Sequence, residues 1–363
     1  MRVRLGDVCE RGSSSLKQSD VEGKTGNYPI FGAAGQIGFV DFYHQGKPYV
    51  AVVKDGAGIG RTTLLPAKSS VIGTMQYLLP KENVLPEYLR YVVQHMHLEK
   101  YFSGATIPHI YFRDYQNEEF QLVGPEKQAE IVDILGRAER VIFLRQRQLR
   151  TLDTLIKARF VEMFGDETNP YNWPITNVED IATVTVGVVI KPAQYYTDAD
   201  HGIKAFRSLN IGEMYIKDND WVYFTQEGNN KNNKSQLHEN DLLIIRSGAP
   251  GVACVVTKQY EGCNAIDIII ARPNTDKIDP CYLCMYTNMP HGKRQIEEGT
   301  GGAAQQHFNV GKYNKLRLML PPIEKQKQFS DFIAQIDKSK SVVQIALNKA
   351  QLLFDSLMQK YFG

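Results

Sequence analysis

The stretch 124–165 reads GPEKQAEIVDILGRAERVIFLRQRQLRTLDTLIKARFVEMFG. It contains no proline after Pro125, and a proline suits the first turn of a helix. Apolar residues recur along it at alternating steps of four and three, the spacing of a narrow coiled-coil seam. The seam positions are Ile131, Leu135, Ala138, Ile142, Arg145, Leu149, Leu152, Ile156, Arg159 and Met163. The pattern predicts one helix of about 38 residues and roughly 57 Å, far longer than one small domain needs.

The end of the chain repeats this pattern. Residues 104–165 lie over residues 302–363 without a gap, so that Gly104 meets Gly302 and His109 meets His307. The second stretch, 321–363, opens with PPIEKQ, and its seam is Phe329, Ile333, Ile336, Lys340, Val343, Leu347, Ala350, Phe354, Leu357 and Tyr361. We expect the two helices to pack on each other as an antiparallel coiled coil; the alternative is that each packs on its own domain.

The segments before the two helices are also related. VRLGDVCE (3–10) corresponds to TNVEDIAT (176–183), and VKDGAGIG (53–60) corresponds to IRSGAPGV (245–252). Further along, PEYLRYVVQHM (86–96) corresponds to PCYLCMYTNM (280–289). Between these points the two copies diverge. The sequence therefore predicts an α/β (α+β) fold with two pseudo-symmetric domains, 1–122 and 166–320, and two helical segments, 123–165 and 321–363.

Composition limits the class of protein. At 363 residues, 43% hydrophobic and 23% charged, the chain is expected to fold throughout. The formal charge is only +2, and the segment 166–320 is slightly acidic. This balance argues neither for nor against nucleic acid. A tight DNA binder acting alone usually has a larger positive excess, so if DNA is the ligand, we expect a partner to share the contact. Five scattered cysteines and the lack of a signal peptide or long apolar run predict a cytoplasmic protein with reduced thiols.

The stretch VVKDGAGIGRTTLL (52–65) resembles a phosphate-binding loop, with Gly56, Gly58 and Gly60 ahead of Arg61. A phosphate loop follows a strand and opens a helix, whereas this stretch runs into a second β-rich segment and no lysine follows the last glycine. A glycine turn between two strands is therefore favoured over a nucleotide site.

Three other motifs have structural and functional interpretations. NPYNWP (169–174) is similar to the Asn-Pro-Pro-aromatic motif of amino methyltransferases but lacks the second proline, which favours a turn. Cys281 and Cys284, with Cys254 and Cys263 upstream, could form a zinc site, although the repeat places Glu87 and Arg90 at the first two positions. His109 and His307 recur in register, and a structural role is favoured.

The polar run EGNNKNNKSQLHEND (227–241) predicts an exposed loop. Its asparagine, glutamine and lysine side chains are also of the kinds that contact bases and phosphates in DNA. The two interpretations are compatible.

Taken in this duplicated order, the motifs resemble the specificity subunit of type I restriction-modification systems over the whole chain. The resemblance rests on RLGDV (4–8) with NVEDI (177–181), the WP at 173–174, DGAGIGR (55–61) with RSGAPG (246–251), and two helices that open with proline and Glu-Lys-Gln. It implies two target recognition domains that each read one half of a split, asymmetric DNA site. The helices are implied to set the gap between the halves.

The resemblance also implies a chain without catalytic residues, cofactor or metal. Adenine methylation with S-adenosylmethionine would belong to two modification subunits docked on the helices, and cleavage to a restriction subunit that uses ATP and Mg. The partners are then double-stranded DNA and these subunits, in a phage-defence complex. Two alternatives remain: a coiled-coil protein that binds modification subunits without DNA specificity, and an enzyme with a nucleotide or cofactor site at 56–61.

Candidate residues follow from side-chain chemistry, because arginine, asparagine and glutamine can contact base edges and lysine contacts phosphates. The predicted DNA contacts are Lys54, Arg61, Lys68, Thr74, Gln76, Lys191, Arg207, Asn210, Lys231, Asn232, Lys234 and Arg246. The predicted coiled-coil interface is Ile131, Leu135, Ile142, Leu149, Leu152, Ile156, Phe329, Ile333, Ile336, Val343, Leu347 and Phe354.

Overall fold

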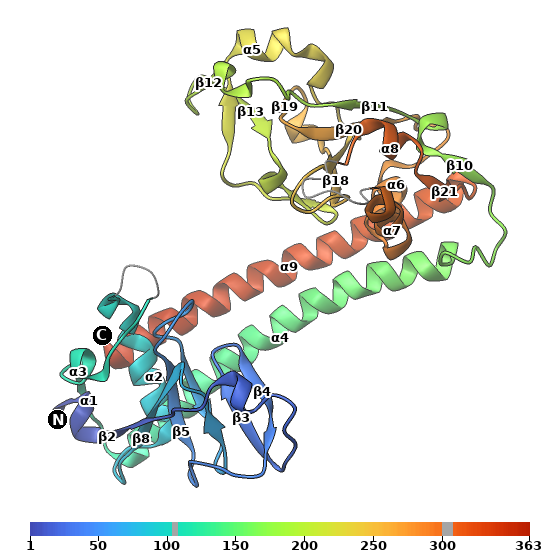
Figure 1. The fold of residues 1–363 in the computed structure, drawn as a ribbon. Helices are drawn as coiled ribbons and strands as arrows, with labels where there is room; N and C mark the ends of the chain where they lie inside the picture. Colours follow the sequence, from blue (N-terminus) through green and yellow to red (C-terminus); the bar gives the residue numbers. More distant parts are fainter. Residues whose placement is uncertain (104–107, 300–307) are drawn as a thin grey trace. The chain divides into compact units, whose positions relative to one another are not determined.

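The computed structural model describes residues 1–103, 108–299 and 308–363 (Figure 1). Gly104, Gly302 and His307, which were matched in the repeat, lie outside these ranges. Contacts divide the chain into two units, the first formed by 1–147 with 343–363 and the second by 148–342. Each unit combines one sheet-containing domain with part of both long helices.

The two long helices are α4 (Pro125–Phe164) and α9 (Ile323–Phe362), drawn in green and red in Figure 1. Each has 40 residues, which corresponds to about 60 Å of helix. They run antiparallel in the second unit, where Phe160 and Phe164 of α4 contact Phe329 while Asp153, earlier in α4, pairs with Lys340, later in α9. The fold class expected from the periodicity and the repeat is therefore confirmed.

The first domain is built on the antiparallel sheet β2-β8-β5-β6. A smaller sheet, β4-β3-β7, and the strand pair β1-β9 complete it. Its strands are β1 (Arg2–Arg4), β2 (Cys9–Ser13), β3 (Tyr28–Gly32), β4 (Gly35–Val40), β5 (Tyr49–Val53), β6 (Thr62–Leu65), β7 (Ser70–Val71), β8 (Met75–Pro80) and β9 (Glu119–Gln121). Its helices are α1 (Leu5–Val8), α2 (Pro86–His95) and α3 (Phe112–Tyr115).

The second domain repeats this plan with the sheet β11-β20-β17-β18, the smaller sheet β12-β16-β13-β19 and the strand pair β10-β21. It adds the hairpin β14-β15. The strands are β10 (Ile175–Asn177), β11 (Ala182–Val186), β12 (Tyr196–Thr197), β13 (Ile203–Phe206), β14 (Ile211–Gly212), β15 (Tyr215–Ile216), β16 (Val222–Phe224), β17 (Leu242–Ile245), β18 (Ala253–Val255), β19 (Asn264–Ala265), β20 (Ile268–Pro273) and β21 (Arg317–Met319). The helices are α5 (Gln226–Lys231), α6 (Pro280–Asn288), α7 (Pro290–Gly299) and α8 (Val310–Asn314).

The long helices contribute to the hydrophobic core of each unit. In the first, Ile131 and Leu135 of α4 and Phe354 and Met358 of α9 pack with Tyr88 of α2. In the second, an equivalent cluster joins α4, α6 and α9 through the side chains Phe160, Phe164, Tyr282, Leu283, Phe329 and Ile333. Since these side chains are almost fully removed from water, burial is the main force that joins each domain to the helices.

Candidate DNA-recognition surfaces and the helices that carry them

Two short signatures of the sequence perform the same structural task in both copies. The carboxylate of Asp7 in RLGDV accepts a hydrogen bond from the backbone of Arg4 at 3.1 Å, and Asp180 in NVEDI does the same for Asn177 at 3.2 Å. Each aspartate thus closes the first turn after a strand that pairs with the last strand of its domain. The two signatures therefore belong to the structure that both domains share, in contrast to the segments whose sequences diverge.

The glutamine of each Glu-Lys-Gln signature joins a long helix to its domain. Gln128 is fully buried and accepts from the backbone N–H of Leu85, at the start of α2, at 2.9 Å. Gln326 accepts from the backbone N–H of Asp279, at the start of α6, also at 2.9 Å. The repeat detected this glutamine, but its role depends on a contact between distant segments and required the structure.

The glycine motif of the first domain is a turn between β5 and β6. Gly56, Gly58 and Gly60 have φ of 86°, 88° and 80°, a region that favours glycine. Hydrogen bonds from Val53 to the carbonyl of Arg61 and from Gly60 to the carbonyl of Val53, both 2.9 Å, close the turn. Because a strand follows the turn, it lacks the helix N-terminus of a phosphate loop.

A small polar cluster lies beside this turn at one end of the sheet. Nδ1 of His109 lies 2.5 Å from a carboxylate oxygen of Asp55, and the ammonium of Lys54 lies 3.6 Å from the other oxygen. Among the residues that the structure describes, the hydroxyl of Thr74 and the side-chain nitrogen of Gln76 are buried there without a hydrogen-bond partner. The fold thus brings three of the predicted contacts, Lys54, Thr74 and Gln76, to the end of the sheet that carries the turn.

Arg61 and Lys68 have the exposure that a direct DNA contact requires. Arg61 is exposed on the turn itself, and Lys68 is exposed on the connection from β6 to β7 with a φ of 54°. Gln76, in contrast, is only 4% exposed. Among the predicted contacts of the first domain, Arg61 and Lys68 are thus exposed, whereas Lys54 and Thr74 are half-buried and Gln76 is buried.

The equivalent turn of the second domain connects β17 to β18. Hydrogen bonds from Ile245 to Val252 and from Gly251 to Ile245, of 2.9 and 3.0 Å, match those of the first turn. Arg246 is largely buried there; its guanidinium pairs with Asp267 at 2.5 Å and donates to the carbonyl of Phe308 at 3.1 Å. These contacts hold the end of β17 in place, a task that the sequence did not predict for Arg246.

The other predicted contacts of the second domain fall into two groups. Lys191, Lys231 and Lys234 are exposed, and Lys231 is paired with Glu227 one turn earlier on α5. Arg207, Asn210 and Asn232 instead donate hydrogen bonds to backbone carbonyls. Asn210 is fully buried, and its side-chain amide lies 2.7 Å from the carbonyl oxygen of Asn219.

The predicted coiled-coil positions face inward. Ile131, Leu135, Ile156, Phe329, Ile333, Ile336, Val343 and Phe354 are buried, while Ile142, Leu149, Leu152 and Leu347 are half-buried. Sequence periodicity did not single out Phe160 and Phe164, both fully buried, because they contact α6 as well as α9. Large apolar side chains on other faces of the helices are exposed, namely Val141, Phe143, Leu144, Leu155, Val161, Val342, Ile345, Leu352 and Leu353.

The cysteine and NPYNWP motifs are structural in this fold. Burial raises the pKa of Cys254 to about 12 and of Cys281 to about 11, which disfavours metal-binding thiolates. Within residues 1–103, 108–299 and 308–363, no group of three or more His, Cys, Asp or Glu side chains could hold a metal ion. The side chain of Asn169 accepts from the backbone of Trp173 at 2.9 Å, forming a turn. In the described parts of the chain, no helix is long and apolar enough to cross a membrane.

The chain thus carries two similar sheet domains on two long helices, and comparison with known proteins identifies the class. The model of the type I restriction modification DNA specificity domain matches residues 1–153 and 166–350. The chain therefore belongs to this family and contains two copies of its domain. Members of the family recognise DNA for a restriction-modification system and are not catalytic.

Solved structures share the fold at low sequence identity. The S subunit of a type I restriction-modification system from M. genitalium matches with a TM-score of 0.60 and 14% identity, covering 100% of this chain and 96% of that one. A structure that addresses complex assembly and conformational transition of the type I R-M system matches with a TM-score of 0.55 and 15% identity, covering 99% and 97%. At these identities the likeness supports the fold.

Proposed function

We propose that this chain is the specificity subunit of a type I restriction-modification complex and that its two domains read the two halves of a split, asymmetric DNA site. The observation that carries the proposal is the duplication of one frame with different insertions. The strand pairs and helix-start glutamines are repeated, whereas the second domain adds the β14-β15 hairpin and α5. Two domains that share a core structure but differ in their added elements are suited to recognise different DNA sequences.

Direct contacts with DNA are assigned to the exposed cations. Arg61 and Lys68 serve the first half-site, and Lys191, Lys231 and Lys234 serve the second. Arginine can bind guanine in a bidentate manner, and lysine contacts phosphates. The buried polar residues, such as Gln76 and Asn210, support the surface from beneath.

The long helices hold the domains and bind two modification subunits. Support comes from the exposed apolar side chains of α4 and α9, because large apolar groups outside the seam are typical of an interface with another protein. Methylation with S-adenosylmethionine and the use of ATP and Mg then belong to the partner subunits. The complex works in the cytoplasm.

The test is methylome sequencing of cells that express the modification subunit with and without this chain. A new split methyladenine motif that depends on the chain is the expected result. Binding of the modification subunit without any dependent motif would leave only an interaction role for the coiled coil. Binding of S-adenosylmethionine by the isolated chain would instead favour an enzyme with its own cofactor site.

A further inference from the structure

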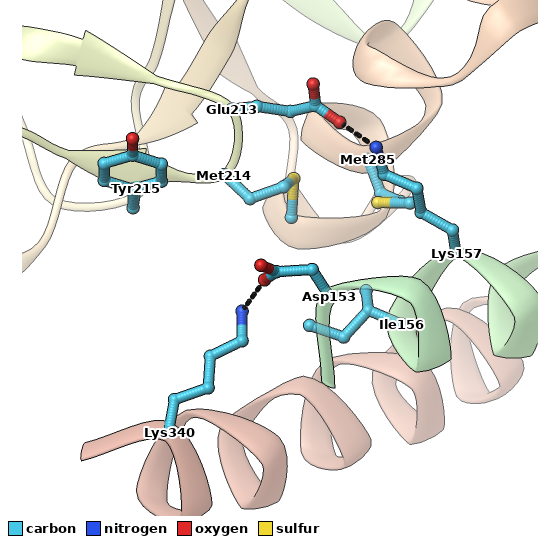
Figure 2. A pocket seen from close by; sticks show the side chains of 8 residues that line it. All are labelled: Asp153, Ile156, Lys157, Glu213, Met214, Tyr215, Met285 and Lys340. Atoms are coloured by element: carbon cyan, nitrogen blue, oxygen red, sulfur yellow. Dashed lines mark ion pairs between the residues drawn. The ribbon is translucent and has the colours of Figure 1, made fainter. Parts of the chain in front are cut away.

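A half-buried carboxylate connects the second domain to α4 beside the apolar core. Glu213 lies in the turn of the hairpin β14-β15, and its carboxylate pairs with Lys157 of α4 at 2.6 Å and with Lys293 of α7 at 3.0 Å. Figure 2 shows Glu213 reaching toward Lys157 above the helices. One side chain of the domain thus bridges two helices.

The surroundings shield the Glu213 carboxylate from solvent more than those of a fully exposed ion pair would. It borders a cavity of about 220 Å³ whose apolar lining includes Ile156, Met214 and Met285. The Glu213 side chain is 30% exposed, so solvent screens its charge incompletely. Burial by itself raises the pKa of Glu213, but the hydrogen bonds to Lys157 and Lys293 outweigh burial and lower the pKa.

The hairpin that carries Glu213 is also attached to the recognition sheet. The backbone of Met214 donates to the carbonyl of Ala253 in β18 at 2.9 Å. The hairpin and the turn at Gly248 line one pocket of about 430 Å³. Glu213 therefore forms a short connection between the turn of the second domain and α4.

This connection adds ion pairs to the apolar joint of the second unit, which runs along α4 from Ile156 to Phe164. Phe164 packs against Tyr282 with ring centroids 4.8 Å apart. Lys157 precedes Phe164 by two helical turns, or about 10 Å along the axis. Apolar contact is non-directional, so a domain held by it alone could rotate on α4, whereas the ion pairs of Glu213 with Lys157 and Lys293 favour one orientation.

The first domain has its own carboxylate bridge to α4, with the charges reversed. Glu139 of α4 accepts from the guanidinium of Arg90 in α2 at 2.8 and 2.7 Å and from the hydroxyl of Tyr91 at 2.9 Å. The bidentate geometry fixes the orientation of both groups. In each unit, therefore, a carboxylate with more than one donor joins domain and helix beside an apolar core.

We propose that Glu213 and Glu139 are positioning residues that fix the angle of each recognition domain on α4 and thereby limit the gap lengths that the protein accepts. This inference rests on the proposed function. The apolar cores keep each domain folded and attached, while the two bridges remove rotational freedom. Loss of a bridge leaves the bases read in each half-site unchanged and widens the range of accepted gaps.

The experiment uses the complex of this chain with its modification subunits and a DNA library that keeps both half-sites and varies the gap one base pair at a time. The variants are Glu213→Gln and Glu139→Gln. The matched controls are Asp133→Asn and Glu162→Gln, which alter exposed carboxylates paired with Arg137 and Arg159 of the same helix. Methylation at each gap is read by sequencing, and unfolding midpoints show that every variant is folded.

For each glutamine variant, methylation at neighbouring gaps relative to the preferred gap should rise by about tenfold, equivalent to about 1.4 kcal/mol. The controls should keep the wild-type profile. The charge exchange Arg90→Glu with Glu139→Arg should restore the narrow profile that each single change widens. Lys157→Met, which spares the pair of Glu213 with Lys293, should widen it to a smaller extent.

An unchanged gap profile in folded Glu213→Gln and Glu139→Gln complexes would overturn the role of the bridges and leave the proposed function intact. A uniform fall in methylation at all gaps, without a change in their ratio, would also overturn it, because that result indicates a purely structural role. A wild-type complex with no half-site or gap preference would overturn the proposed function and this inference together.

Discussion

Shortening both long helices by one heptad should shorten the gap in the DNA site. Asp153 of α4 pairs with Lys340 of α9, so the matched segments to remove are 143–149 and 344–350. Seven residues correspond to about 10 Å of helix, which is roughly three base pairs at 3.4 Å each. Removal of a heptad preserves the seam and rotates the helix faces by only about 20°.

The assay is methylation of a DNA library in which both half-sites are constant and the gap varies. We expect the preferred gap to fall by about three base pairs. The rate should fall as well, because three base pairs turn the second half-site by about 105° around the DNA axis, at 10 to 10.5 base pairs per turn. Duplication of the same segments retains every exposed apolar residue and should lengthen the gap equally. An unchanged gap in both folded variants would refute the view that the helices set it.

Three further predictions concern single residues. Arg61→Ala should relax sequence recognition in one half-site only, whereas the control Arg2→Ala, on the strand pair β1-β9, should leave recognition unchanged. An equal loss of binding to specific and unrelated DNA would exclude base reading by Arg61. Phe160→Ala should destabilise the second unit by about 3–5 kcal/mol in urea unfolding because its ring is fully buried, against about 0.5 kcal/mol or less for Phe143→Ala, which is 54% exposed. Burial lowers the pKa of His291. Below about pH 6.5 the unfolded chain therefore binds a proton that the folded chain does not, and the free energy of unfolding falls. His291→Gln should reduce this fall when unfolding midpoints are measured against pH, and an equal pH dependence in both proteins would contradict the prediction.

The long helices were predictable because their signal is local and repeated. The steps of four and three indicate that Ile131, Leu135 and Ile333 face inward, and this signal does not depend on the rest of the sequence. The duplicated Glu-Lys-Gln likewise pointed to a shared structural role. The pattern is visible in the sequence because each turn of the helix places its inward-facing residues in a similar apolar environment.

The recognition surface was harder to predict because side-chain type does not reveal which partner a residue meets. Asn210 and Arg246 have the chemistry of base readers, yet in this fold they bind a neighbouring carbonyl and Asp267. No motif or repeat in the sequence marks Glu213, which the β14-β15 hairpin places against α4. These contacts join segments far apart in the chain, and no local period encodes them.

The most direct test of the central claim is to replace the second domain with a copy of the first. Matching strand registers place residue 2 on residue 175 and residue 121 on residue 319, so 1–122 should substitute for 174–320 in the same frame. Methylome sequencing with the modification subunit should then give a symmetric site, with the first half-site repeated in inverted orientation across the gap. An asymmetric motif identical to that of the unaltered chain would contradict the claim that each domain reads one half.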